Sequence, residues 1–151
     1  KLMVDEPKTP RSFDEWAKTV HPTILNDPLW EFKVYPKSLF AYDLAWADCG
    51  YLLKDPRGKA VSSQLIRSIG SISANIEEGF GRGYGKDYAY RLRISLGETR
   101  ESRGWYWKSR HLLPSEVLDH RLNLLSEIIA MLRPNIKLQQ NFKASRVASN
   151  K

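Results

Sequence analysis

Four arginines and one tryptophan lie along a single segment of the chain, and both residue types are common in nucleic-acid-binding surfaces. At 100° per residue in a helix, five side chains between residues 93 and 110 fall within about 100° of one another, on one side of the cylinder. They are Arg93, Arg100, Arg103, Trp107 and Arg110. Arginine donates paired hydrogen bonds to phosphate or stacks on a base, and tryptophan provides a face for an unpaired base. The pattern predicts a nucleic-acid contact surface on one helix.

The same helix has a structural alternative. Glu98 and Glu101 are spaced to pair with basic neighbours, and Trp107 is of a type that packs at the end of a helical bundle. Leu92 and Leu96 share part of the arginine sector, so the first half of the stripe borders a core. The change from leucine to arginine along this sector suggests that the far end of the helix faces solvent or another subunit.

A glycine-rich segment precedes this helix. Glycine alternates with other residues from Gly79 to Gly85, and Arg82 and Lys86 add positive charge. Backbone amides in such a segment can bind phosphate. Because the segment follows a predicted helix and lacks the P-loop spacing, it does not indicate a nucleotide-binding fold. Two alternatives stay open: a turn between helices that needs positive φ, and an extension of the phosphate contacts through Arg82 and Lys86.

Residues for catalysis or metal binding do not form a recognisable pattern. The three histidines are scattered, and adjacent Glu77 and Glu78 point in different directions on a helix, where one is expected to pair with a nearby arginine. Cys49 is the only cysteine, which excludes an internal disulfide and a multi-thiolate zinc site. We expect Cys49 to be a small core residue. We therefore expect no catalytic residue, no metal and no cofactor.

Length and composition are those of one folded domain with tails. The chain has 151 residues, of which 42% are hydrophobic and 27% charged. The longest apolar run, Ile128 to Leu132, is far shorter than the ~20 residues of a membrane span. Lys1 to Glu6 lack the apolar stretch of a secretory signal. With a single cysteine, these features predict a cytoplasmic protein with no membrane partner.

The net charge of +7 is concentrated in two regions. Residues 56–111 contain 11 basic and 5 acidic side chains, and residues 134–151 contain 4 basic and no acidic ones. Each of the other three regions, 1–35, 36–55 and 112–133, sums to −1. A concentrated positive charge favours polyanionic partners, here RNA or DNA. The alternatives are an ordinary solvated surface or one that contacts an acidic protein.

Apolar periodicity predicts four helices, and no segment alternates with period two as a strand would. The predicted stripes are Leu39, Tyr42, Trp46, Cys49 and Leu53; Val61, Leu65, Ile69, Ile72 and Ile76; and Leu118, Leu122, Leu125, Ile129 and Leu132. The second helix is expected from Pro56 to about Glu78, the third from Asp87 to about Arg110 and the fourth from Ser115 to Leu132. Short connections then predict an all-α, antiparallel up-down four-helix bundle over residues 36–133.

Local signals mark the ends of these helices and the flanking segments. Asp55 and Asp87 are the expected N-caps of the second and third helices, and Gly79 is the expected C-cap of the second. Pro134 is expected to end or kink the fourth helix, leaving residues 134–151 as a short basic tail.

Residues 1–35 contain four prolines and are predicted to form an N-terminal arm with short helical pieces, outside the core. Ser12 and Glu15 fit a capping box for a helix from Phe13 to about Val20. This helix would present Phe13 and Trp16 for docking. Asp27 before Pro28 predicts a second capped turn.

The segment from the second to the third predicted helix resembles a known family. The residues that carry the resemblance are Ser73-Ala74-Asn75-Ile76-Glu77-Glu78-Gly79-Phe80-Gly81-Arg82, Tyr88 and Arg91-Leu92-Arg93-Ile94-Ser95-Leu96-Gly97. They resemble the bacterial four-helix bundle family encoded in intervening sequences of 23S ribosomal RNA genes. That family also includes the accessory variability determinant proteins of diversity-generating retroelements. The resemblance covers residues 36–133.

This resemblance implies an antiparallel four-helix bundle that assembles as a homopentameric barrel. For the retroelement members it also implies binding of nucleic acid and of a reverse transcriptase, with no catalytic site of their own.

The residues and the resemblance together predict a non-catalytic oligomer that binds RNA or DNA. A more specific hypothesis is that it acts as an accessory to a retroelement reverse transcriptase. The predicted nucleic-acid contacts are Arg82, Lys86, Arg93, Arg100, Arg103, Trp107 and Arg110. The basic side chains would contact phosphates and Trp107 would stack on a base. The alternative hypothesis is a structural or protein-interaction module that does not bind nucleic acid directly.

Overall fold

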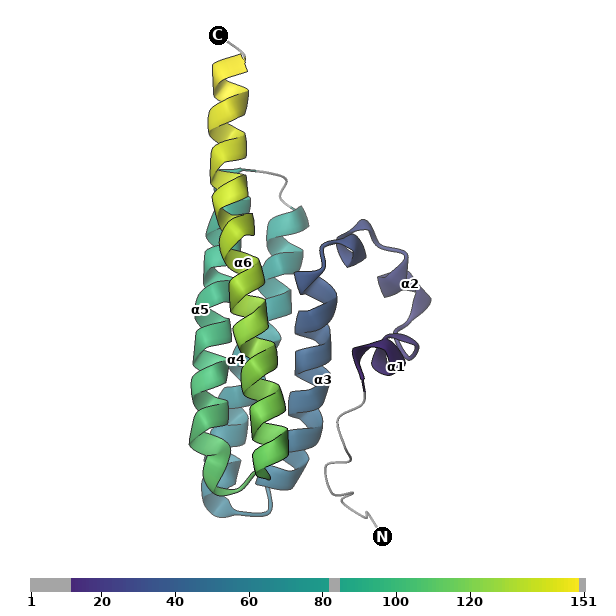
Figure 1. Cartoon of the computed structure of the whole chain (residues 1–151), viewed down its shortest axis with the longest axis vertical. Helices are drawn as coiled ribbons and strands as arrows, with labels where there is room; N and C mark the ends of the chain where they lie inside the picture. Colours follow the sequence, from purple (N-terminus) through teal and green to yellow (C-terminus); the bar gives the residue numbers. More distant parts are fainter. Residues whose placement is uncertain (1–11, 82–84, 150–151) are drawn as a thin grey trace.

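Four long helices lie side by side in the computed structural model, which describes residues 12–81 and 85–149, with side chains up to residue 141. They are α3 (Val34–Leu52), α4 (Pro56–Gly81), α5 (Lys86–Lys108) and α6 (Ser115–Ser149). Consecutive helices run in opposite directions, with α3 and α5 on opposite sides and α6 projecting beyond the others (Figure 1). Every regular element within the described ranges is helical, which confirms the all-α prediction. Among these helices, none is long and apolar enough to cross a membrane.

The predicted stripe of α4 lies at the centre of the core. Leu65, Ile69, Ile72 and Ile76 are fully buried, and Val61 is half-buried. The predicted heptad of α6 is buried at four of its five positions: Leu118, Leu125, Ile129 and Leu132. Burial of each large aliphatic side chain contributes about 1.5–3 kcal/mol, so these two stripes supply much of the hydrophobic stabilisation.

The buried face of α3 differs from the predicted one. Trp46 is 67% exposed and Leu53 is 54% exposed, so these two members of the predicted stripe do not face the core, whereas Leu39 and Tyr42 are half-buried against it. The buried residues of α3 include Ser38, Ala41, Ala45, Asp48 and Leu52, each one position before a predicted residue, and also the larger Phe40 and Leu44. Small side chains allow α3 to pack closely on its neighbours. A prediction from hydrophobic periodicity selects large apolar residues instead, so it did not select these small ones. Cys49 is buried, as predicted, and burial raises the pKa of its thiol.

The residues that begin and end the helices agree only in part with the sequence signals. Asp55 caps α4 as predicted, because its carboxylate accepts the backbone N–H of Arg57 at 2.8 Å. The N-cap of α5 is Gly85, with φ 83°, so Asp87 lies in the first turn rather than at the cap. Gly85 thereby meets the expectation of a positive-φ glycine in the loop.

Gly79 lies inside α4 and is not the predicted C-cap. A Cβ at this position would lie 2.8 Å from atoms of Tyr88 and Arg91 on α5. Glycine is therefore required at position 79 for the close approach of α4 and α5, and the helix continues to Gly81.

Three short helices, α1 (Phe13–Ala17), α2 (Pro22–Leu25) and η1 (Pro28–Glu31), precede the bundle. Ser12 caps α1 as predicted, since its Oγ accepts the N–H of Glu15 at 3.2 Å, but the helix ends at Ala17. Asp27 caps η1, accepting the N–H of Leu29 at 2.8 Å. These contacts confirm the predicted short helical pieces.

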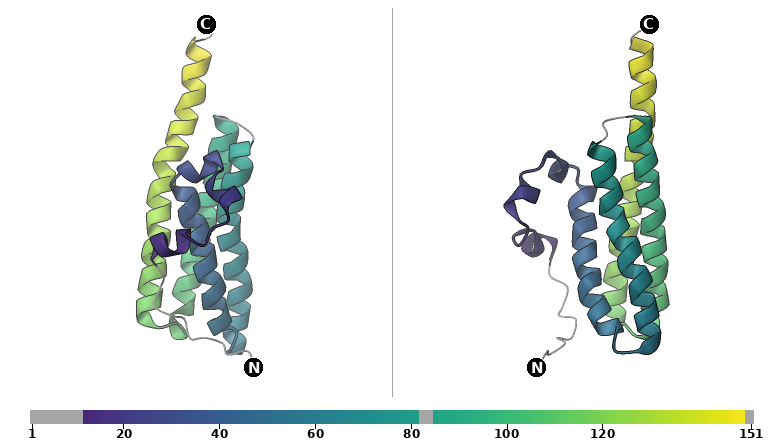
Figure 2. Two further views of the ribbon diagram at one scale, coloured as in Figure 1. Left: turned by 90° about the vertical axis from the view of Figure 1, so that its right-hand side faces the viewer. Right: turned by 180° about the vertical axis from the view of Figure 1, so that it is seen from behind.

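This N-terminal segment packs on the bundle along α3 (Figure 2). Trp16 is only 6% exposed, and its Nε1 donates a hydrogen bond to Asp43 at 2.7 Å. Its ring lies 5.3 Å from that of Phe40, and Leu29 is buried in the same cluster. The prediction that the segment lies outside the core, with Trp16 available for docking, is therefore wrong for these residues. They dock on their own chain.

Pro134 lies within α6 and does not end it. Proline cannot donate to the carbonyl four residues earlier, which belongs to Ala130. Both residues are exposed, so water can hydrate this carbonyl, while Ile136 beyond the proline is buried and holds the helix to the core. The helix therefore extends through most of the predicted tail.

Candidate nucleic-acid interface

The solvent side of α5 carries two rows of residues, each with a spacing of seven. The first row is Lys86, Arg93, Arg100 and Trp107, and the second is Tyr90, Gly97 and Gly104. Because seven residues span nearly two turns, neighbours within a row lie about 10.5 Å apart along one line. Tyr90 is 59% exposed and Trp107 is 53% exposed, and the charged members of the first row are also exposed. We call these seven residues the α5 face.

The opposite side of α5 is fixed by contacts with α3, α4 and α6. Ser95 Oγ donates to the Ile72 carbonyl of α4 at 2.9 Å, and Tyr106 donates to Asp48 of α3 at 2.7 Å. At the start of the helix, the N–H of Gly85 donates to Gln139 of α6 at 3.1 Å. These contacts determine the rotation of α5 about its axis, so the α5 face points away from the bundle.

The two glutamates of α5, Glu98 and Glu101, belong to its contact with α4. Arg67 of α4 lies 3.5 Å from Glu98 and also forms an ion pair with Glu101. Burial and the nearby Glu101 raise the pKa of Glu98, an effect that Arg67 opposes. The expectation that these glutamates pair with basic neighbours is therefore confirmed. Their partner, Arg67, lies on α4, so these glutamates do not pair with the arginines of the α5 face.

Arg93 and Arg100 differ in this respect from the structural arginines of the chain. Arg91 pairs with Glu78 at 3.1 Å, and Arg121 pairs with buried Asp48 at 2.7 Å. Within the described part of the chain, neither Arg93 nor Arg100 forms an ion pair or a side-chain hydrogen bond. Two exposed guanidinium groups, seven residues apart on the same row, thus carry a positive charge that no carboxylate of the described residues neutralises.

Arg103 and Arg110 flank this row and make local contacts. Arg103 is half-buried and donates to Ser126 Oγ of α6 at 3.2 Å. Arg110 donates to the Trp107 carbonyl at 3.1 Å, and its guanidinium lies 4.4 Å from the centre of the Trp107 ring. Trp107 is 53% exposed, so about half of its surface remains open to solvent.

The structure brings together most of the predicted contact residues. Lys86, Arg93, Arg100 and Trp107 share one row, while Arg103 and Arg110 lie at its edge. Arg82 lies outside the described residues, so its predicted contact has no structural counterpart here.

Two features of this candidate interface were not predicted from the sequence: the second row of the α5 face, and Arg133 of α6. Tyr90, Gly97 and Gly104 form the second row of the α5 face, and their spacing of seven was a signal that the arginine pattern obscured. Arg133 of α6 is exposed and lies seven residues after Ser126, which accepts a hydrogen bond from Arg103. It therefore shares the side of α6 that borders α5, and only the packing of the two helices could reveal this.

The glutamates considered for acid-base chemistry have structural partners. Tyr35 donates to Glu77 at 2.7 Å, and Glu78 pairs with Arg91 at 3.1 Å, as expected for one member of the pair. Among the described residues, no group of three or more His, Cys, Asp or Glu side chains could hold a metal ion.

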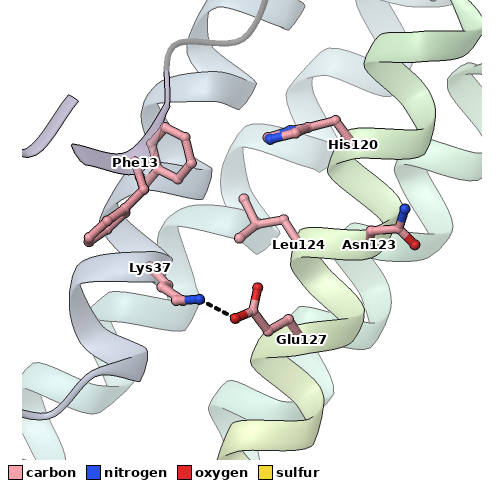
Figure 3. A pocket seen from close by; sticks show the side chains of 7 residues that line it. Phe13, Lys37, His120, Asn123, Leu124 and Glu127 are labelled. Carbon is pink, nitrogen blue, oxygen red and sulfur yellow. Dashed lines mark hydrogen bonds and ion pairs between the residues drawn. The ribbon is translucent and has the colours of Figure 1, made fainter. Parts of the chain in front are cut away.

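A cavity of about 310 Å³ lies between α1, α3 and α6 (Figure 3). Lys37 and Glu127 at its edge form an ion pair, and His120 lies beside Phe40 on its other side. Burial and the charge of Arg121 lower the pKa of His120. The lining contains no hydroxyl or thiol that could act as a nucleophile beside this histidine.

A second exposed feature is an apolar groove of about 430 Å³ between α3 and α4. We call it the α3–α4 groove, and its lining residues are Trp46, Cys49, Gly50, Leu53, Lys59, Ser62, Ser63 and Ile66. Ser62 is 4% exposed, and its Oγ has no hydrogen-bond partner among the described residues. The groove therefore combines a large exposed apolar surface with an unsatisfied polar atom.

Comparison with known proteins adds a family. The family model for the 23S rRNA-intervening sequence protein matches residues 34–134. A crystal structure from Bacteroides thetaiotaomicron, of a protein with unknown function from the S23 ribosomal protein family, is similar with a TM-score of 0.65 and 27% identity. The match covers 69% of this chain and 98% of that one. The curated proteins contain no significant match. Neither the family description nor that of the similar structure names a catalytic activity.

Proposed function

The chain belongs to the 23S rRNA-intervening sequence protein family, and from this premise we propose that it is a non-catalytic, oligomeric protein that binds RNA or DNA through the α5 face. In this proposal, Lys86, Arg93 and Arg100 contact phosphates and Trp107 stacks on a base. Arg110 and the half-buried Arg103 extend the contact at the end of the row.

The observation that carries the proposal is the absence of carboxylate partners for Arg93 and Arg100 among the described residues. The nearby glutamates of α5 are directed to Arg67 instead. An exposed guanidinium without a carboxylate is free to donate paired hydrogen bonds to phosphate. Two such groups on one straight row, beside an exposed tryptophan, favour a polymer of phosphates over a single acidic side chain.

The test of this proposal is a salt titration of binding to a labelled oligonucleotide. If one subunit contacts three to four phosphates, the logarithm of the association constant should fall against that of salt concentration with a slope of about −2 to −4 per subunit. Binding with a slope near zero would eliminate the phosphate-contact mechanism. Catalytic turnover of the oligonucleotide would contradict the non-catalytic part of the proposal.

We also propose that the chain assembles with further copies of itself, five in the form that the resemblance implies, through the α3–α4 groove. Trp46 is 67% exposed and Leu53 is 54% exposed in this groove, and an exposed apolar surface of this kind favours contact with another protein surface. The groove lies on α3 and α4, while α5 lies on the opposite side of the bundle from α3 (Figure 1). Both surfaces can therefore act at once, and repeated α5 faces on one particle would increase avidity.

Leu53→Glu should shift the native mass toward that of the monomer, because it places a charge in the proposed contact. Leu138→Glu is the matched control, since Leu138 of α6 is 59% exposed and Leu53 is 54% exposed. Native mass spectrometry at one protein concentration measures the outcome. Equal mass distributions for both variants would contradict assembly through the groove.

The α3–α4 groove also favours a second candidate function, a protein-interaction module without direct nucleic-acid binding. In that case the groove would bind a different protein, and the resemblance names a reverse transcriptase as the candidate. Purified chain that carries no nuclease-sensitive absorbance at 260 nm, and that binds a coexpressed reverse transcriptase, would favour this second function.

A further inference from the structure

We infer that the α5 face binds single-stranded nucleic acid in preference to a duplex, with Tyr90 and Trp107 stacking on unpaired bases. This inference rests on the proposed function and adds the class of nucleic acid. It is carried by the distribution of aromatic, cationic and glycine residues along the α5 face.

The two aromatic residues lie near opposite ends of the face. Tyr90 is 59% exposed and Trp107 is 53% exposed, although both belong to types that are usually buried in part. They are 17 positions apart, which corresponds to about 25 Å of helix. Exposed rings at this separation offer two stacking platforms for one extended strand. A duplex cannot use them, because neighbouring pairs cover the faces of its bases.

Arg93 and Arg100 lie between the two rings, on the same outward side. They form no ion pair within the described part of the chain, so they are available to the phosphates that connect the stacked bases. A strand that follows the helix would therefore meet an aromatic ring, two guanidinium groups and a second ring. Cationic groups and aromatic platforms along one surface are the combination typical of single-strand binding.

The glycines of the second row have no side chains that project from the helix beside Arg93 and Arg100. A Cβ added to Gly97 or Gly104 would meet no atom within 4 Å, so packing within the chain does not require glycine at either position. Glycine inside a helix is less favourable than alanine. At these two positions no side chain lies next to Arg93 and Arg100, so the backbone of a nucleic-acid strand can approach the helix closely.

The experiment compares the affinity of the intact protein for a 12-nucleotide single strand and for the duplex formed with its complement. The parent protein should bind the single strand at least tenfold more tightly. Tyr90→Leu with Trp107→Leu should weaken single-strand binding by about 30-fold or more, as expected for two lost stacking contacts, and change duplex binding by less than about twofold. Tyr90→Phe with Trp107→Phe is the matched control and should retain most of the preference.

Each outcome has a distinct meaning. Equal affinity of the parent for both probes, or equal loss on both in the leucine variant, would overturn the single-strand inference while leaving phosphate binding intact. Absence of salt-dependent binding to either probe would instead reject the proposed function. A fall in native mass in the leucine variant, with equal loss on both probes, would show that the α5 face contacts a second copy, and would also overturn the inference.

Discussion

Replacement of Asp48 by alanine should lower the free energy of unfolding by about 3–5 kcal/mol, because it leaves a buried charge without its partner. Asp48 is 0% exposed and Arg121 is 3% exposed. The carboxylate accepts hydrogen bonds from Arg121 Nε at 2.7 Å and from Tyr106 at 2.7 Å. Burial and the charge of Asp48 raise the pKa of Tyr106 well above its ordinary value, so Tyr106 remains a donor. The three residues join α3, α5 and α6.

Urea unfolding followed by circular dichroism, at one protein concentration, measures this loss. Asp119→Ala is the control, since this exposed residue of α6 should change stability by less than about 0.5 kcal/mol. Replacement of the whole network by Asp48→Leu, Tyr106→Phe and Arg121→Met should recover most of the loss, because no buried charge then remains. A loss below about 1 kcal/mol for Asp48→Ala would show that water reaches Arg121 and that the network does not hold α5 in place.

Arg93→Gln combined with Arg100→Gln should weaken oligonucleotide binding by about 30-fold. The estimate takes roughly 1 kcal/mol for each lost contact between an exposed guanidinium and a phosphate. Both side chains are exposed and have no ion pair among the described residues, so their removal should leave the fold intact. Fluorescence anisotropy with a labelled single strand measures the affinity.

The matched control for this loss is Lys18→Gln with Lys33→Gln. It also removes two positive charges, but from exposed positions of the N-terminal segment and outside α5. Non-specific attraction by net charge would make the two double variants equally weak, whereas local phosphate contact predicts less than a threefold effect for the lysine variant. Equal losses in both would remove the reason to assign binding to the α5 face.

Apolar periodicity was sufficient to predict α4 and α6, because their buried residues are large and aliphatic. The stripe from Leu65 to Ile76 is fully buried at the positions that the pattern selects. The same method was wrong for part of α3, where Ser38, Ala41 and Ala45 pack against the core while Trp46 and Leu53 are exposed. Hydrophobicity alone does not distinguish a buried apolar residue from an exposed one, so these two residues were assigned to the core.

The arrangement of the proposed contact residues was predictable to the extent that they share one helix. The angular clustering of Arg93, Arg100 and Trp107 depends only on helical geometry, and the structure retains it. Contacts between helices were beyond reach from sequence alone. Asp48 lies 58 positions before Tyr106 and 73 before Arg121, and no local spacing connects them. Likewise, the arrangement that places Arg133 beside α5 depends on the packing of α6 against it.

Ultraviolet cross-linking of the intact protein to a single-stranded oligonucleotide, followed by mass spectrometry of the peptides, would locate the bound strand directly. Binding along α5 predicts cross-linked peptides within residues 86–110, with Tyr90 or Trp107 as the modified side chains. Cross-links confined to residues 12–76, which include the N-terminal helices, α3 and most of α4, would contradict binding through the α5 face.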